Sequence, residues 1–126
     1  MDAEDPRTQK ELGRSVNNFN RFKWADDEKN GRPRCWNIVW RGNMAKFSQN
    51  TWLKDELLST EENIIAEASP WDRTWGIGLK KNEKGACSPS VWPGANWLGQ
   101  VLMSVRSFLN NDDAPYLRVN DERKPV

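Results

Sequence analysis

The most regular apolar pattern of the chain lies near its C-terminal end. Apolar side chains recur there at three- and four-residue spacing, which places them on one face of a helix. Asn96 is the expected cap, and Asn110, Asn111 and Pro115 end the pattern. The pattern predicts a core helix with a buried stripe made of Leu98, Val101, Leu102, Val105, Phe108 and Leu109.

Shorter helices are predicted in the first half of the chain. Asp5 followed by Pro6 is typical of a helix start, and residues 7–16 continue from it. Residues 17–34 set aromatic side chains among Asn, Asp, Gly and Pro, a composition typical of a loop. Helical spacing returns over residues 35–48. The first half of the chain is therefore predicted to be helical with one long loop.

The middle of the chain adds one more helix and the only strand-like run. Asn50 can cap a helix over residues 51–59, which would bury Trp52 or Leu53 together with other leucines. Residues 64–66 are short and β-branched, as in a buried strand. The expected fold class is mainly α (α+β), a compact helical domain with minor β-structure.

Composition excludes several classes of function. The chain has 126 residues, enough for one small domain, and 19 basic against 18 acidic residues leave a net charge of +1. Such a balance gives no general reason to expect a nucleic-acid or membrane partner. The mean hydropathy is −0.90, and no apolar run is long enough to span a bilayer. We therefore expect an intracellular, cytoplasmic protein.

The chain has no histidine and eight tryptophans. The commonest general base and the usual catalytic triads are thus missing. Cys35 and Cys87 have no metal-ligand spacing, so neither a metal nor another cofactor is expected. The two cysteines could form one disulfide, but the composition favours two thiols in a reducing compartment. Chemistry in this chain must use carboxylates, lysines, hydroxyls and aromatic faces.

Residues 67–78 combine carboxylates, a guanidinium, two indoles and two glycines. Indole faces stack on flat heterocycles, and glycine lets the backbone approach a ligand closely. Asp72 could orient a water or stabilise positive charge at an anomeric carbon. The alternative is a packed turn in which Asp72 caps a backbone N–H group and Arg73 pairs at the surface. Composition alone favours this structural alternative.

Three further residues have two interpretations each. Trp24 could stack on a ligand or anchor a polar loop by packing. Lys46 could bind a phosphate or be an ordinary exposed lysine beside Phe47. Asn96 could orient a ligand at a helix N-terminus, where the dipole favours phosphate, or simply cap that helix.

The order of several motifs resembles the NADAR (NAD- and ADP-ribose-associated, YbiA-like) domain family. The resemblance covers residues 1–109 and predicts a domain over residues 1–110, followed by a polar tail over residues 111–126. The segments that carry it are Asp5-Pro6-Arg7, Leu12-Gly13-Arg14, Arg41-Gly42-Asn43, Lys46-Phe47-Ser48-Gln49-Asn50, Leu57-Leu58 with Thr60, Glu67-Ala68-Ser69, Asp72-Arg73-Thr74-Trp75-Gly76-Ile77-Gly78 and Asn96-Trp97-Leu98-Gly99.

The resemblance implies an N-glycosidase domain. Members of the family cleave N-glycosidic bonds in phosphoribosylamino-pyrimidine intermediates of riboflavin synthesis or remove ADP-ribose from nucleobases. It implies catalytic roles for Asp72 and Trp75, with a heterocycle stacked on Trp75. The implied substrate-binding residues are Trp24 (with Trp36 as a rival for that position), Lys46, Gly76 and Asn96.

One departure from the family pattern leaves the activity open. Full-length members begin with a segment that carries a glutamate of the site, and this chain starts at the middle of the pattern. We therefore expect an N-terminally incomplete domain. It is either a catalytic glycosidase whose other segment is supplied elsewhere, or a truncated remnant that binds ADP-ribose or a nucleotide without cleaving it. A third interpretation is an interaction fragment. The expected partner in the first two cases is a small ribosylated ligand.

Overall fold

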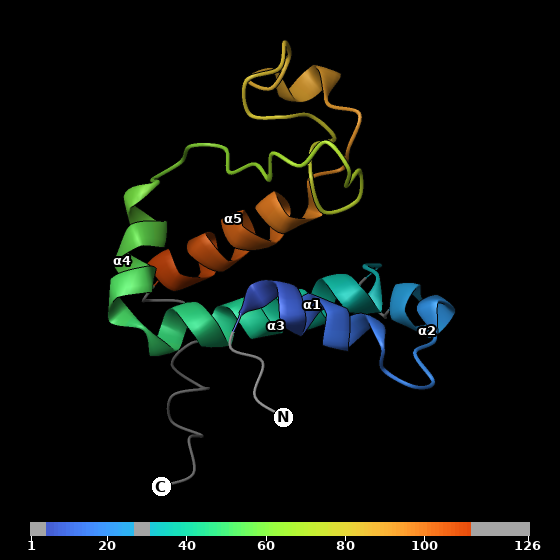
Figure 1. Ribbon diagram of the computed structural model, residues 1–126. Coiled ribbons are helices and arrows are strands. Elements are labelled where there is room, and N and C mark those ends of the chain that lie inside the picture. The colour runs from blue at the N-terminus through green and yellow to red at the C-terminus, as the bar shows by residue number, and fades with distance from the viewer. Residues whose placement is uncertain (1–4, 27–30, 112–126) are drawn as a thin grey trace, which may run out of the picture. The chain divides into compact units, whose positions relative to one another are not determined.

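The computed structural model describes residues 5–26 and 31–111 and has a mainly helical fold (Figure 1). The chain divides into two units, residues 1–35 and residues 36–126. The expected class, mainly α, is confirmed. The predicted tail lies almost wholly outside the described residues. None of the described helices is both long and apolar enough to cross a membrane.

The first unit holds two short helices, α1 (Pro6–Arg14) and α2 (Arg21–Ala25). The predicted start of α1 is confirmed, because the Asp5 side chain accepts a hydrogen bond from the Thr8 amide at 3.0 Å. The loop expected over residues 17–34 is wrong at α2. The Asn20 side chain accepts from two amides of that helix and so supplies a cap that the loop-like composition concealed. Neither helix contains a buried residue.

Three helices form the core of the second unit: α3 (Arg34–Gln49), which begins at the boundary between the units, α4 (Thr51–Ser59) and α5 (Trp97–Asn110). The predicted stripe of α5 is confirmed as core, since Val101 and Val105 are fully buried. Trp40 of α3 donates its indole N–H to the Ser104 hydroxyl at 3.0 Å, and its ring meets Phe108 edge-on. The buried cluster consists of Trp36, Leu57, Val101, Val105 and Leu109.

One expectation for the middle of the chain needs correction, and one open alternative is decided. Helix α4 has the predicted bounds, and of the two residues expected to be buried it half-buries Leu53 and leaves Trp52 71% exposed. Residues 64–66 form no strand. The carbonyl of Ile65 accepts a hydrogen bond from the Asn96 side chain, so the backbone is paired with an amide and not with a neighbouring strand. Of the two isoleucines in this run, Ile65 is partly buried against the core and Ile64 is 60% exposed.

Arg106 of α5 is buried, and its Nη1 donates to the Thr60 hydroxyl and to the Asn63 carbonyl, both at 2.8 Å. Thr60 is the C-cap of α4. The guanidinium therefore lies where the α4 carbonyls leave partial negative charge, which stabilises a cation. Arg106 thus joins α5 to the end of α4 and to the chain that leads into residues 67–78.

Candidate functional site

The loop over residues 67–78 is irregular in backbone but closely hydrogen-bonded to the start of α5. The Trp97 and Leu98 amides donate to the Thr74 and Trp75 carbonyls at 3.0 and 3.1 Å. These amides are among those that a helix N-terminus normally leaves unpaired. The loop carbonyls therefore occupy the positive end of α5, the place where the sequence suggested a phosphate could bind.

Asp72 holds the tight turn of this loop. Its Oδ1 accepts hydrogen bonds from the Thr74 amide at 2.9 Å and the Trp75 amide at 2.7 Å. The capping role weighed from composition is therefore present. No described residue donates a hydrogen bond to Oδ2, and the side chain is only partly buried. One carboxylate oxygen fixes the turn, and the other is available to a ligand or a water.

Trp75 is half-buried and lies against the hydrophobic core. Its ring meets the Trp97 ring edge-on, with centroids 5.5 Å apart and planes at 90°. Such an arrangement is favourable for two aromatic rings and orients the Trp75 indole, whose backbone amide is bound to Asp72. Only part of the Trp75 surface is left for a heterocycle.

Gly76 is buried where the loop closes on itself. A Cβ at this position would lie 2.7 Å from the Asp72 carbonyl oxygen and 3.0 Å from that of Glu67. Its own carbonyl accepts from the Asn96 amide at 3.0 Å. No larger residue fits without moving the backbone, so Gly76 is needed for the close approach between the turn and the start of α5.

Asn96 is 3% exposed and adopts a left-handed backbone with φ of 53°. It occupies the cap position of α5, but its side chain makes no capping bond. Instead, Oδ1 accepts from the Glu67 amide at 3.0 Å and Nδ2 donates to the Ile65 carbonyl at 2.9 Å. The side chain therefore joins the segment before the loop to the segment after it. Its predicted part in substrate binding stays a prediction.

The structure thus brings Asp72, Trp75, Gly76 and Asn96 together in one hydrogen-bonded assembly. Lys46 is exposed in the last turn of α3, where its Nζ lies 5.4 Å from the centre of the Phe47 ring. No hydrogen bond or ion pair between described residues joins Lys46 to the loop. The role of Lys46 in phosphate binding remains a prediction.

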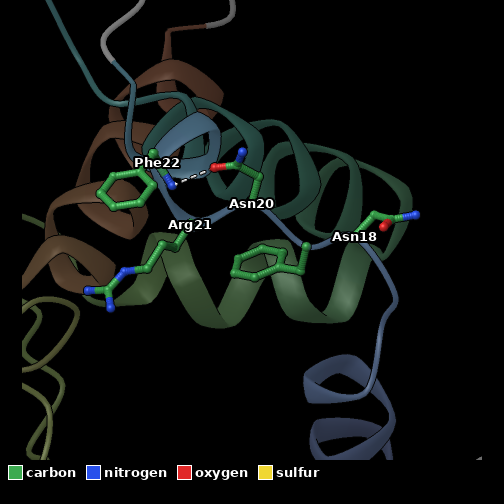
Figure 2. A pocket seen from close by; sticks show the side chains of 5 residues that line it. Asn18, Asn20, Arg21 and Phe22 are labelled. Atoms are coloured by element: carbon green, nitrogen blue, oxygen red, sulfur yellow. Dashed lines mark hydrogen bonds between the residues drawn. The ribbon is translucent and has the colours of Figure 1, made fainter.

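Trp24 belongs to the first unit and packs against Phe19, with ring centroids 6.0 Å apart. The same unit contains a shallow hollow with a volume of about 500 Å³. Figure 2 shows side chains that line it and the hydrogen bond from the Phe22 amide to the Asn20 side chain. The hollow contains no carboxylate and no residue of the 67–78 loop, so it offers none of the expected chemistry. Its lining residues are Asn18, Phe19, Asn20, Arg21 and Phe22.

Two glycines for which the sequence predicts no role, Gly94 and Gly99, lie in close contact with this assembly. Gly94 and Gly99 look like ordinary loop and helix glycines. A Cβ on Gly94 would lie 2.3 Å from the Gly76 carbonyl oxygen, and one on Gly99 would lie 2.1 Å from that of Ile65. Close-packed glycines carry no local sequence signal, because their neighbours come from distant parts of the chain.

The two cysteines are not joined. Cys35 is buried, Cys87 is exposed, and neither forms a disulfide.

Comparison with known proteins gives a consistent match. The family model described as NADAR domain matches residues 1–110. A protein of Acanthamoeba polyphaga mimivirus named N-glycosidase is 46% identical over 97 residues, which are 77% of this chain and 53% of that protein. A Nostoc punctiforme protein named N-glycosidase is 34% identical over 68 residues, 54% of this chain and 36% of that protein.

A chloroplastic riboflavin biosynthesis protein of Zea mays is 37% identical over 70 residues, 56% of this chain and 10% of that protein. The chain spans about half the length of the mimivirus protein and less of the other two. No solved structure matches the chain.

Proposed function

We propose, since the chain belongs to the NADAR domain family, that it contributes to hydrolysis of the N-glycosidic bond in a ribosylated, nucleobase-like compound. Relatives named N-glycosidase and riboflavin biosynthesis protein support this class of reaction. The observation that carries the proposal is that the two carboxylate oxygens of Asp72 have different surroundings. Its Oδ1 is held by two backbone amides, and its Oδ2 is open.

In the proposed reaction, water adds to the anomeric carbon of the ribose. The carbon–nitrogen bond breaks, its electron pair passes to the departing nitrogen, and a proton from the water ends on that nitrogen. The sugar develops positive charge in the transition state. The open oxygen of Asp72 stabilises this charge or orients the water. One well-placed electrostatic group of this kind is commonly worth about 3–4 kcal/mol.

The neighbouring residues are proposed to give the carboxylate its position. Trp75 donates its amide to Asp72 and forms one wall of the site with the exposed part of its indole. Gly76 allows the turn to close. Lys46, Asn96 and Trp24 are proposed to contribute to substrate binding.

The substrate classes proposed are a phosphoribosylamino-pyrimidine and an ADP-ribosylated base. The second candidate function is binding of ADP-ribose without cleavage. The observation that favours it is that the match spans 53% of the mimivirus protein, so that the resemblance supports part of a domain of this family.

The test compares base release by the full chain and by two single-atom variants. Asp72→Asn keeps an Oδ1 that can accept the hydrogen bonds from both turn amides, and it replaces Oδ2 by an –NH2 group. Asp55→Asn makes the same change at an exposed carboxylate of α4. Each protein is incubated with both substrate classes, and the released base is measured by liquid chromatography. We expect Asp72→Asn to reduce release about 10²- to 10³-fold and Asp55→Asn to leave it unchanged.

Two outcomes contradict the catalytic proposal. Wild-type chain that releases no base from either substrate class contradicts hydrolysis, and calorimetric titration with ADP-ribose then decides whether binding remains. Equal activity in Asp72→Asn and the wild type would instead remove Asp72 from the reaction.

A further inference from the structure

Trp71 is the most exposed of the large hydrophobic residues that the structure describes, with 92% of its surface accessible. It directly precedes Asp72, the residue that holds the turn. Both faces of an indole this exposed are accessible, and aromatic faces are favourable stacking partners for flat rings. The family resemblance predicts stacking for Trp75 and no individual role for Trp71.

The backbone that carries Trp71 is well determined by its neighbours. Pro70 precedes it and restricts its own φ. The Ser69 and Ile77 amides both donate to the Glu67 carbonyl at 2.9 Å, which closes the base of the loop. The two hydrogen bonds to Asp72 Oδ1 close its tip. The backbone at Trp71 is therefore fixed by the turn. When a ring stacks on the indole, the protein loses little backbone freedom.

The chemistry on either side of Trp71 indicates what would stack on it. Asp72 offers an open carboxylate oxygen one residue away, and Arg73 offers an exposed guanidinium one residue further. An indole suits a flat heterocycle, a carboxylate suits ribose hydroxyls or positive charge, and a guanidinium suits phosphate. These three groups occur in consecutive positions and match the three parts of a nucleotide.

The exposed tryptophan of α4 lacks this setting. Trp52 is 71% exposed and lies on a regular helix, without a carboxylate fixed by backbone amides beside it. Trp75 and Trp97 are partly covered by one another. Among the described tryptophans, Trp71 alone combines an almost fully accessible indole with a position on the Asp72 turn.

We propose that Trp71 is a substrate-contacting residue on which the heterocycle of the ligand stacks, with Trp75 serving as the packed wall behind Asp72. This inference rests on the proposed function, because it deepens the description of the same site. It assigns recognition of the base to a residue whose indole makes no hydrogen bond or aromatic ring contact with another described residue.

The experiment measures binding of two probes to the full chain by titration calorimetry. ADP-ribose contains a flat ring, and ribose 5-phosphate lacks one. Trp71→Ala should weaken ADP-ribose binding about 5- to 150-fold, the usual effect of removing one stacked base contact, and should not change ribose 5-phosphate binding. Trp71→Phe should retain most of the affinity. Trp52→Ala is the matched control and should bind both probes like the wild type.

The outcomes separate this inference from the proposed function. Unchanged ADP-ribose affinity in Trp71→Ala, with Asp72→Asn still inactive, overturns stacking on Trp71 and leaves the reaction standing. Equal loss for both probes also overturns it, since the residue would then only support the loop. No binding of ADP-ribose by the wild type overturns it as well, and base release then decides the proposed function independently.

Discussion

Replacing Asn96 tests most directly whether its side chain and its left-handed backbone stabilise the assembly around Asp72. Asn96→Ala removes the donor to the Ile65 carbonyl and the acceptor for the Glu67 amide. It also places a Cβ-bearing residue without a polar side chain at φ of 53°. Two unrelated contributions to stability are thereby lost in one substitution.

The cost can be worked out from these two contributions. A partly buried backbone group left without a partner costs about 1–3 kcal/mol, and two such groups remain after the substitution. The left-handed conformation costs alanine about 1 kcal/mol more than asparagine or glycine. We expect Asn96→Ala to lower the free energy of unfolding by about 3–7 kcal/mol. Asn96→Gly should be about 1 kcal/mol less destabilising than Asn96→Ala, because it removes only the hydrogen bonds.

The measurement is urea denaturation of the full chain followed by far-ultraviolet circular dichroism. Asn110→Ala is the matched control, since Asn110 is exposed at the last residue of α5, and it should change stability by less than about 0.5 kcal/mol. A free energy of unfolding for Asn96→Ala within about 1 kcal/mol of the wild type contradicts the role given to the two hydrogen bonds. A lower stability of Asn96→Gly than of Asn96→Ala contradicts the cost given to the left-handed backbone.

Two further predictions concern other parts of the chain. Arg106→Met should lower the free energy of unfolding by about 2 kcal/mol, because the Asn63 carbonyl and the Thr60 hydroxyl lose their donor; a change below about 0.5 kcal/mol in the same urea assay contradicts this. The pKa of Asp5 is lowered from 3.8 because the Thr8 hydroxyl and amide donate to it. Its cap therefore stabilises α1 above the unfolded pKa, and this contribution is lost as pH falls through the lowered folded value. The Thr8 amide shift in NMR should titrate with a midpoint below 3.8, whereas a midpoint at or above 3.8 contradicts the cap.

Helices were predictable wherever the signals are local. The cap at Asp5, the bounds of α4 and the stripe of α5 each depend on residues within one or two turns, so the sequence contains the whole cause. Helix α2 was missed because one cap residue outweighed an otherwise loop-like composition. The strand expected at residues 64–66 was wrong because its backbone pairs with a side chain about thirty positions away.

The candidate site also has some features that local sequence predicts and others that depend on distant contacts. Sequence alone determined that carboxylate, indole and glycine meet in residues 67–78, since these groups are neighbours along the chain. Tertiary structure decided which oxygen of Asp72 is open, which indole is packed and which is exposed, and that Asn96 joins two segments. Those outcomes depend on contacts between residues far apart in sequence, and no local pattern encodes such contacts.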